Sequence, residues 1–296
     1  MDINPYDAIV VGSGATGGIA ALTLAEQGIK VLVIEAGSKI NRLEASNYEP
    51  KSTLKRLSGV LTKKHSNQCQ HPGYWKNNPD LYSNELNHPY EFPEKKPFIW
   101  TQGKQIGGRS LTWGGITLRF SSEDFNPAQK DGFGPNWPIS YEDLSPHYDF
   151  VENFCGIYGR KDNIKEVPNG KYIGEIPLTE SEHIFGKKVK SKLNYPFIQS
   201  RGFDRNSSVK EKQWPKSSSL GSTLKKALDT GNVQIISNYL VESFELNKRT
   251  ELATRLRIVN LENGRKEILN CDLILLCAST ISTPVSYTHL TLPTTT

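Results

Sequence analysis

The sequence lacks any long hydrophobic run. No stretch of the 296 residues approaches the ~20 consecutive apolar residues that a membrane-spanning helix requires. The first apolar run begins at Ala8, so we expect neither a secretory leader nor a membrane span. A cytoplasmic protein is therefore predicted.

Cysteine is scarce, and its spacing fits no metal-binding motif. The four cysteines, Cys69, Cys155, Cys271 and Cys277, are scattered along the chain. This pattern favours free thiols in a reducing compartment and predicts no metal site.

Aromatic residues are lacking where positive charge is densest. The net charge is +5, and its densest part runs from Lys51 to Lys64, with only Tyr48 and Tyr74 as nearby aromatics. Nucleic-acid binders interleave stacking side chains with their basic residues. We therefore expect a solvated basic face and no nucleic-acid partner.

The N-terminus carries a glycine-rich pattern between two apolar runs. It reads Asp7-Ala-Ile-Val-Val-Gly12-Ser-Gly14-Ala-Thr-Gly17-Gly18, and the second run, Val31 to Ile34, is followed by Glu35. Apolar runs of this kind are typical of strands buried on both faces of a parallel sheet. Gly28 is placed to end the intervening helix in a left-handed conformation. The spacing predicts a dinucleotide-binding βαβ unit.

Each part of this pattern has a separate role. Gly12 permits a tight turn, Gly14 lets the backbone approach a pyrophosphate, and Gly17 allows close packing of helix and sheet. The free N–H groups of the helix face the phosphates. Glu35, about twenty residues further on, can accept hydrogen bonds from a ribose. Taken alone, the pattern fits NAD as well as FAD.

A second glycine-rich stretch follows a long connection. Residues 38 to about 98 are polar and without a clear period, which is typical of a lid or excursion. The stretch from Gly107 to Gly115 then provides another place where backbone can approach a ligand closely. Further on, Ser145 and Pro146 predict a helix start, and residues 156–216 are predicted to be loop-rich.

The last third of the chain predicts a return to the nucleotide domain. A helix is expected from Ser222 to Leu228, closed by Gly231, and a strand from Val233 to Ile236. A meander follows, with strands at 241–246, 253–261 and 266–269 and a turn at Asn263-Gly264. Residues 271–277 are expected to form a buried strand.

Four blocks resemble the flavin-binding portion of glucose-methanol-choline (GMC) oxidoreductases, in particular bacterial sugar-dehydrogenase-like members. They are Gly12 to Gly18 with Glu35; Gly107-Gly108-Arg-Ser110-Leu-Thr-Trp113-Gly114; Asp131-Gly-Phe-Gly-Pro-Asn-Trp137-Pro138-Ile-Ser140-Tyr-Glu-Asp-Leu; and Cys277-Ala278-Ser279-Thr280-Ile-Ser-Thr-Pro284. The resemblance spans nearly all of residues 7–284. The second and third blocks narrow it to this family, and the second favours FAD over NAD.

The resemblance implies an FAD site and a fold. The fold class is α/β, with a Rossmann-like FAD-binding domain of parallel central sheet and β-meander, plus a partial substrate domain. The implied cofactor-binding residues are Gly12, Ser13, Gly14, Ala15, Thr16, Gly17, Glu35, Ala36, Gly107, Gly108, Ser110, Trp113, Gly114, Val241, Ala278 and Ser279. Some sugar-oxidising relatives bond FAD covalently through a histidine where this chain has Thr112, so we expect noncovalent FAD.

The resemblance also implies a reaction but supplies no catalytic residue. The family removes a hydride from an alcohol carbon while a base takes the hydroxyl proton, a role that histidine fits. In the family that histidine follows the fourth block. The histidines of this chain match no family catalytic position; they are His65, His71, His88, His147, His183 and His289. Catalytic residues are therefore unknown.

The C-terminal residues are expected to be foreign to the natural protein. Val285 to Thr296 lacks charge and apolar period, and its residues can be encoded by a transposase adapter used in sequencing libraries. We expect an FAD-binding domain at 1–145, with a lid-like insertion at about 38–98, a partial substrate domain at 146–219, a return at 220–284 and a non-native tail at 285–296.

Three functions remain open at this stage. The first is a fragment of an FAD-dependent dehydrogenase that oxidises a small alcohol or sugar and passes electrons to an unknown acceptor. The second is another FAD-dependent oxidoreductase, such as an amine oxidase or a ketosteroid reductase, against which the second and third blocks argue. The third is a non-catalytic or unstable flavin-binding fragment.

Overall fold

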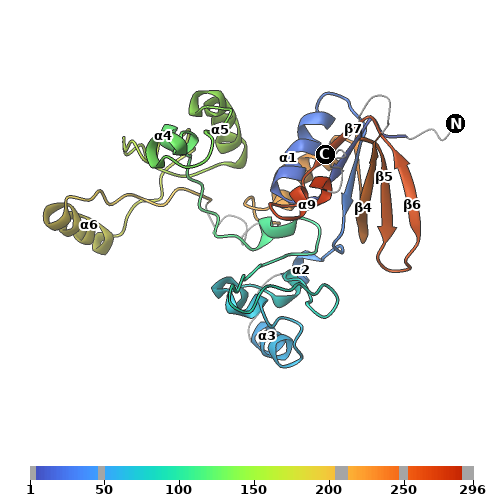
Figure 1. Ribbon diagram of the computed structural model, residues 1–296. Helices are drawn as coiled ribbons and strands as arrows, with labels where there is room; N and C mark the ends of the chain where they lie inside the picture. The colour runs from blue at the N-terminus through green and yellow to red at the C-terminus, as the bar shows by residue number, and fades with distance from the viewer. Residues whose placement is uncertain (1–4, 46–50, 204–212, 247–252, 289–296) are drawn as a thin grey trace. The chain divides into compact units, whose positions relative to one another are not determined.

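The computed structural model describes residues 5–45, 51–203, 213–246 and 253–288 (Figure 1). The chain forms two compact units, residues 1–113 with 213–296 and residues 114–212. The chain thus leaves the first unit after Trp113 and rejoins it at Gln213, whereas the sequence predicted boundaries at 145/146 and 219/220. Contacts of Trp113, Ser217 and Ser219 within the first unit account for the difference.

A four-stranded parallel sheet is the centre of the first unit. It contains β1 (Ala8–Val11), β2 (Val31–Glu35), β3 (Val233–Ser237) and β7 (Leu273–Leu276), in the order β3-β2-β1-β7. Val11 pairs with Ile34 on one side and with Leu276 on the other. The carboxyl ends of β1, β2 and β7 therefore meet at one edge, where ligands bind in open α/β sheets.

The burial of the strands follows their place in the sheet. Every residue of β1 and β2 is buried, as their continuous apolar runs predict. In contrast, β7 is half-buried, and Leu273 is exposed. The prediction of a buried strand at 271–277 was therefore wrong: among the described residues, β7 has a partner on one side alone, so its outer side lacks the cover that β1 has.

Two helices pack against each other beside this sheet. α1 (Ala15–Ala25) follows β1, and α8 (Thr223–Asp229) precedes β3 (Figure 1). A Cβ atom at Gly18 would lie 2.5 Å from Thr223 Oγ1, so glycine permits this close approach. Gly28 has φ +80°, the left-handed conformation that was predicted, and Gly231, which was predicted to close the later helix, has φ +77°.

The predicted meander is confirmed. β4 (Tyr239–Leu246), β5 (Ala253–Asn260) and β6 (Lys266–Asn270) form an antiparallel sheet in chain order. Its inner face packs on the parallel sheet in one apolar cluster (Figure 1). The cluster contains Ile9, Val11, Leu32, Ile34, Phe244, Leu256, Ile258 and Cys271. The two sheets therefore share one core, and the fold class is the α/β class that the sequence predicted.

The long connection after β2 is more regular than predicted. It contains α2 (Arg42–Ala45), α3 (Lys51–Leu61) and the 3-10 helices η1 (Gln68–Gln70), η2 (Pro72–Trp75) and η3 (Pro79–Leu81). Leu54, Leu57 and Leu61 on α3 recur at helical spacing but are exposed. The buried side of α3 is instead polar, since Arg56 Nε donates to Asn77 O at 3.0 Å.

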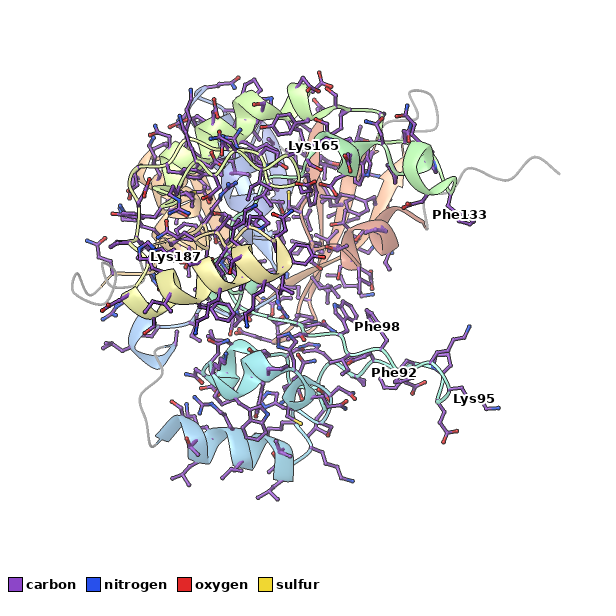
Figure 2. All side chains as sticks on the ribbon, turned by 90° about the vertical axis from the view of Figure 1, so that its left-hand side faces the viewer. Phe92, Lys95, Phe98, Phe133, Lys165 and Lys187 are labelled. Carbon is purple, nitrogen blue, oxygen red and sulfur yellow. The ribbon has the colours of Figure 1, made fainter. Side chains whose placement is uncertain are left out.

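The connection ends in a loop whose base is closed by Tyr90. The hydroxyl of Tyr90 accepts a hydrogen bond from Trp100 N at 2.9 Å, and the two rings meet edge to face. Figure 2 shows Phe92 and Phe98 on this loop and Lys95 near its tip. Two further 3-10 helices belong to the first unit. They are η4 (Gly108–Leu111), after this loop, and η6 (Ser219–Gly221).

The second unit is built around a buried ion-pair network. It contains η5 (Ser122–Phe125), α4 (Pro127–Asp131), α5 (Tyr141–Cys155) and α6 (Glu180–Leu193). Arg119 donates from Nε to Glu152 Oε1 at 2.9 Å and from Nη2 to Asp149 Oδ1 at 2.6 Å. Within the described part of this unit, strand pairing is limited to isolated bridges, such as that between Ile116 and Gly202.

Two helices of this unit differ from prediction. α5 begins at Tyr141, not at Pro146, because Ser140 and Asp143 form a reciprocal capping box one turn earlier. Pro146 therefore lies inside the helix. α6 falls in a stretch predicted to be loop-rich, although Thr179 and Glu182 form a capping box that the sequence displays.

The helix after β7 is α9 (Ser282–Thr288). The rest of the predicted foreign tail, residues 289–296, lies outside the described residues. In the described ranges, no helix combines the length and apolarity needed to cross a membrane.

Candidate dinucleotide-binding site

The site is built at the carboxyl edge of the parallel sheet. Gly12 follows β1, and its N–H donates to Ile34 O at 2.8 Å. Gly12 has φ +101°, and a Cβ there would lie 2.4 Å from the Cys277 carbonyl oxygen. Both the turn and the approach of the chain after β7 therefore require glycine.

The N-terminus of α1 is open toward this edge. Gly14 is the N-cap residue, and no side chain caps the helix there. A Cβ at Gly14 would meet nothing within 4 Å, whereas one at Gly17 would lie 1.8 Å from Gly12 O. Free N–H groups at a helix start, beside open space, suit a phosphate group. Gly14 thus lines open space, while Gly17 is needed for packing.

Glu35 ends β2 and is held beside the glycine-rich loop. Its Oε2 accepts from Ser13 N at 3.0 Å and from Ser13 Oγ at 2.6 Å, and its Oε1 accepts from Gly37 N at 2.8 Å. The residue is buried. The backbone amides and the hydroxyl therefore hold the carboxylate in one position.

Ser13 also connects this loop to the second glycine-rich stretch. Gly107 N donates to Ser13 Oγ at 2.9 Å. A Cβ at Gly108 would lie 3.6 Å from Gly14 Cα, so the two glycine loops face each other. The sequence separates these loops by more than ninety residues, and the fold brings them together around one hydroxyl.

A second serine pair fastens the Gly107 loop from the other side. Ser110 Oγ accepts from Ser219 N at 3.0 Å, and Ser219 Oγ donates to Ser13 O at 2.9 Å. These side chains are buried. Ser13, Ser110 and Ser219 therefore form one polar network that links three separate segments of the first unit.

The remaining predicted residues lie around this network. Ala278 lies beside Gly12, and Ala278 and Val241 pack against the shared core. Ser279 has φ +79°, and Trp113 Nε1 donates to Ser217 O at 2.8 Å. Ala15 and Thr16 are the first residues of α1, and Ala36 directly follows β2. Gly114 opens the second unit, so its position relative to these residues is not described.

Several contributors were missed by the sequence. Ser219 and Cys277 both contact the glycine-rich loop, and Gln105 Nε2 donates to Gly108 O at 3.0 Å. Cys277 lies within a block that was singled out, but only for the residues after it. The Ser217-Ser218-Ser219 run was the available signal for Ser219.

Lys104 is a partly buried cation of the first unit. Burial lowers the pKa of Lys104, and the charge of Glu35 opposes that shift. The backbone of Lys104 lies against Gly37, where a Cβ would come within 2.0 Å of Lys104 C. The backbone after Glu35 and the backbone of Lys104 are therefore in close contact.

Two histidines bond to residues outside the two glycine loops. His65 Nδ1 lies 3.2 Å from Tyr74 Oη, and His88 Nδ1 lies 3.0 Å from Lys104 Nζ. Burial lowers the pKa of both imidazoles. Across the described ranges, no three His, Cys, Asp or Glu side chains gather as metal ligands, and His289 lies outside those ranges.

Comparison with known families decides the identity of this arrangement. The sequence model of the GMC oxidoreductases matches residues 6–286. This chain belongs to the GMC oxidoreductase family. Membership confirms the resemblance drawn from the four blocks and implies an FAD cofactor.

Curated members of the GMC family match parts of the chain. Paromamine 6'-oxidase of Streptomyces fradiae is 27% identical over 161 residues, which cover 53% of this chain and 24% of that protein. The fructose dehydrogenase large subunit of Gluconobacter japonicus is 25% identical over 206 residues, or 66% and 36% of the two chains. An oxygen-dependent choline dehydrogenase of Acinetobacter baumannii is 22% identical over 300 residues, or 96% and 49%.

Solved structures support the fold. Pyridoxine 4-oxidase from Mesorbium loti superposes with a TM-score of 0.59 at 17% identity, covering 95% of this chain and 51% of that one. A formate oxidase of Aspergillus oryzae, studied for FAD modification, gives 0.57 at 15% identity, covering 95% and 47%. The chain spans about a quarter to a half of the length of these GMC relatives.

Proposed function

We propose that this chain is the FAD-binding portion of an oxidoreductase that oxidises an alcohol or sugar hydroxyl. The observation that carries the proposal is the meeting of the two glycine loops at Ser13, beside the fixed carboxylate of Glu35. Family membership supports FAD as the dinucleotide. Paromamine 6'-oxidase and fructose dehydrogenase support a hydroxyl-bearing substrate.

The residues of the first loop have distinct tasks in this proposal. The N–H groups at the start of α1 bind the pyrophosphate, and Gly14 leaves room for it. Glu35, with Ala36 beside it, accepts hydrogen bonds from the hydroxyl groups of the adenosine ribose. Val241 contacts the adenine through its backbone, as the family resemblance implies.

The second loop and the chain after β7 have their own tasks. Gly107, Gly108 and Ser110 lie along the flavin, with Trp113 continuing that wall, and Ala278 and Ser279 pass beside the ribityl chain. Gly114 is a further cofactor-binding residue that the family resemblance implies. When bound, the flavin accepts the hydride that leaves the alcohol carbon. Ser13 holds the two glycine loops next to each other while FAD binds, because its hydroxyl accepts the N–H of Gly107.

The base that takes the hydroxyl proton is not assigned to any residue of this chain. We propose that a histidine beyond the fourth block fills this role in the complete enzyme, whose relatives are two to four times longer than the part matched here. The proposed substrate is an alcohol or sugar, and no particular electron acceptor is proposed. A cytoplasmic location remains part of the proposal.

Thr112 supports noncovalent FAD. It occupies the position at which some sugar-oxidising relatives carry the linking histidine, and its hydroxyl, buried here, points to Arg109 O at 3.4 Å. Because threonine has no imidazole ring, it cannot form the histidine–flavin bond of those relatives.

The alternative is a non-catalytic flavin-binding fragment. For the 296 residues as written, this alternative is favoured by the lack of an assignable base. The test is to amplify and sequence the source DNA across the codons of Thr283 and Pro284. Continuation of the frame to a late histidine supports the dehydrogenase, whereas genomic codons for Val285 to Thr296 followed by a stop support the fragment.

A further inference from the structure

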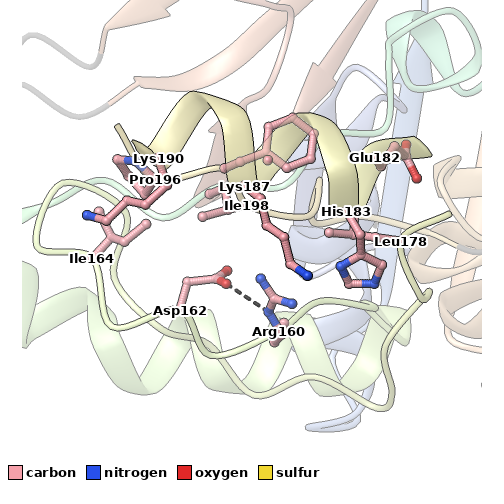
Figure 3. A pocket seen from close by; sticks show the side chains of 12 residues that line it. Arg160, Asp162, Ile164, Leu178, Glu182, His183, Lys187, Lys190, Pro196 and Ile198 are labelled. Atoms are coloured by element: carbon pink, nitrogen blue, oxygen red, sulfur yellow. Dashed lines mark hydrogen bonds and ion pairs between the residues drawn. The ribbon is translucent and has the colours of Figure 1, made fainter. Parts of the chain in front are cut away.

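A cavity of about 350 Å³ lies in the second unit, against α6 (Figure 3). One wall is the face of α6 that carries His183, Lys187 and Lys190, which are spaced four and three residues apart and so share one side of the helix. The facing wall comes from the chain after α5 and includes Arg160 and Asp162.

The cationic groups of this cavity have unused donors. Arg160 donates from Nε to Asp162 Oδ1 at 2.9 Å, and within the described chain its two Nη atoms have no partner. Lys187 and Lys190 likewise form no ion pair with any described residue. In Figure 3 the amino end of Lys187 and the guanidinium of Arg160 point toward each other. Two like charges facing across a cavity repel unless an anion lies between them.

The acidic groups of the lining are already engaged. Glu182 accepts from Thr179 N at 2.7 Å and from Thr179 Oγ1 at 2.8 Å in the capping box. Asp162 lies between two guanidinium groups, since its Oδ2 is 3.6 Å from Arg201 Nη2. The side chain of Asp162 is 5% exposed and that of Arg201 is 1% exposed. Asp162 therefore anchors Arg160 and leaves the lysines without a counter-charge.

The rest of the lining is apolar. Ile164, Leu178, Pro196, Phe197 and Ile198 all line the cavity, and the Phe197 ring meets Phe185 edge to face at 5.5 Å. An inorganic ion would leave this surface in contact with water. A ligand with an apolar body beside its charged group covers it.

We propose that this cavity binds a small organic anion, in which a phosphate or carboxylate group is attached to a ring or short hydrocarbon. The anionic group bonds to the Nη atoms of Arg160 and to Lys187 and Lys190, and the apolar body lies against Leu178 and Phe197. Planar guanidinium and ammonium donors together are a common set for such groups. The site shares no residue with the proposed FAD site, so it does not depend on the proposed function.

The test uses titration calorimetry of the full chain with phenyl phosphate, inorganic phosphate and phenol. Phenyl phosphate is expected to bind with one-to-one stoichiometry and more tightly than either of the other probes. The double variant Lys187→Gln/Lys190→Gln is expected to weaken that binding by about tenfold or more, because two charge-assisted bonds are lost.

The matched control is Lys188→Gln/Lys192→Gln. It removes the same charge from the same helix, including its last turn, but neither residue lines the cavity. Circular dichroism confirms that both variants keep their helix content. The proposal is overturned if phenyl phosphate does not bind, if both double variants weaken it equally, or if inorganic phosphate binds as tightly.

Discussion

The Ser13 hydroxyl lies 2.6 Å from Glu35 Oε2 and, at the same time, accepts the N–H of Gly107 at 2.9 Å. One side chain thus fixes the carboxylate that we propose binds the ribose and also the second glycine loop. Removing it acts on both parts of the proposed FAD site.

Ser13→Ala is expected to weaken FAD binding by about tenfold, since it removes hydrogen bonds worth about 1 kcal/mol each and leaves Gly107 N without its acceptor. Flavin fluorescence titration measures the change. The exposed Ser66→Ala is the control and should leave the affinity unchanged. Equal affinities for Ser13→Ala and the parent chain would contradict the role of Ser13.

Gly14→Ala separates binding from folding. Gly14 has φ −67°, and a Cβ there meets no atom within 4 Å, so the free energy of unfolding should change by no more than about 1 kcal/mol. The added methyl group occupies the approach to the pyrophosphate, so FAD binding should be lost.

The comparison for that prediction is Gly17→Ala, in which the Cβ overlaps Gly12 O. This variant should lose both folding and FAD binding, as judged by urea denaturation and fluorescence. If Gly14→Ala still binds FAD normally, the phosphates do not lie where we propose.

Arg119→Gln is expected to destabilise the second unit by about 3–5 kcal/mol, because it leaves the buried carboxylate of Glu152 without its ion-pair partner. Limited proteolysis between residues 114 and 203 should accelerate accordingly. Lys165→Gln removes an exposed pair with Glu123 and should leave the proteolysis rate almost unchanged. Similar proteolysis rates for the two variants would refute the structural role of Arg119.

Stability is expected to fall as the pH drops below neutrality, in part through His65. Burial lowers the pKa of this imidazole below 6.5 in the folded chain, so the unfolded chain binds the proton first. The free energy of unfolding therefore decreases as the pH falls through 6.5 and levels off below the folded pKa.

His65→Gln removes this titration. Urea denaturation from pH 7.5 to pH 5 should show a shallower dependence on pH in the variant than in the parent chain. A slope that is identical in the two proteins would exclude His65 as a contributor.

The FAD-loaded chain is expected to release its flavin when denatured. Thr112 stands where a covalent link would require histidine, so acid precipitation should leave yellow flavin in the supernatant. Flavin that stays with the precipitated polypeptide would show a covalent link elsewhere.

The parts of the fold that were predicted are those whose signals are local. The run from Asp7 to Glu35 defines β1, α1 and β2 within thirty residues, and Gly28 marks the turn between α1 and β2 by its conformation. The Asn263-Gly264 turn likewise placed the β5–β6 hairpin.

The parts that were missed depend on competition or on distance in the sequence. The sequence predicted a helix start at Ser145 and Pro146, but the reciprocal bonds of Ser140 with Asp143 start the helix earlier. The helix α3 was missed because its segment is polar, and the leucines that it carries face solvent. The bond from Ser219 to Ser13 joins residues 206 positions apart, which no local pattern reveals.

The pairing of β7 with β1 joins residues 273–276 to residues 8–11. During synthesis, the edge of β1 therefore stays without this neighbour until almost the whole of the described chain has left the ribosome. Such late, long-range closure makes folding slow and leaves an apolar strand edge open to association in the meantime. A chain stopped before β7 would therefore keep the outer edge of β1 open, however well the rest of the described first unit had formed.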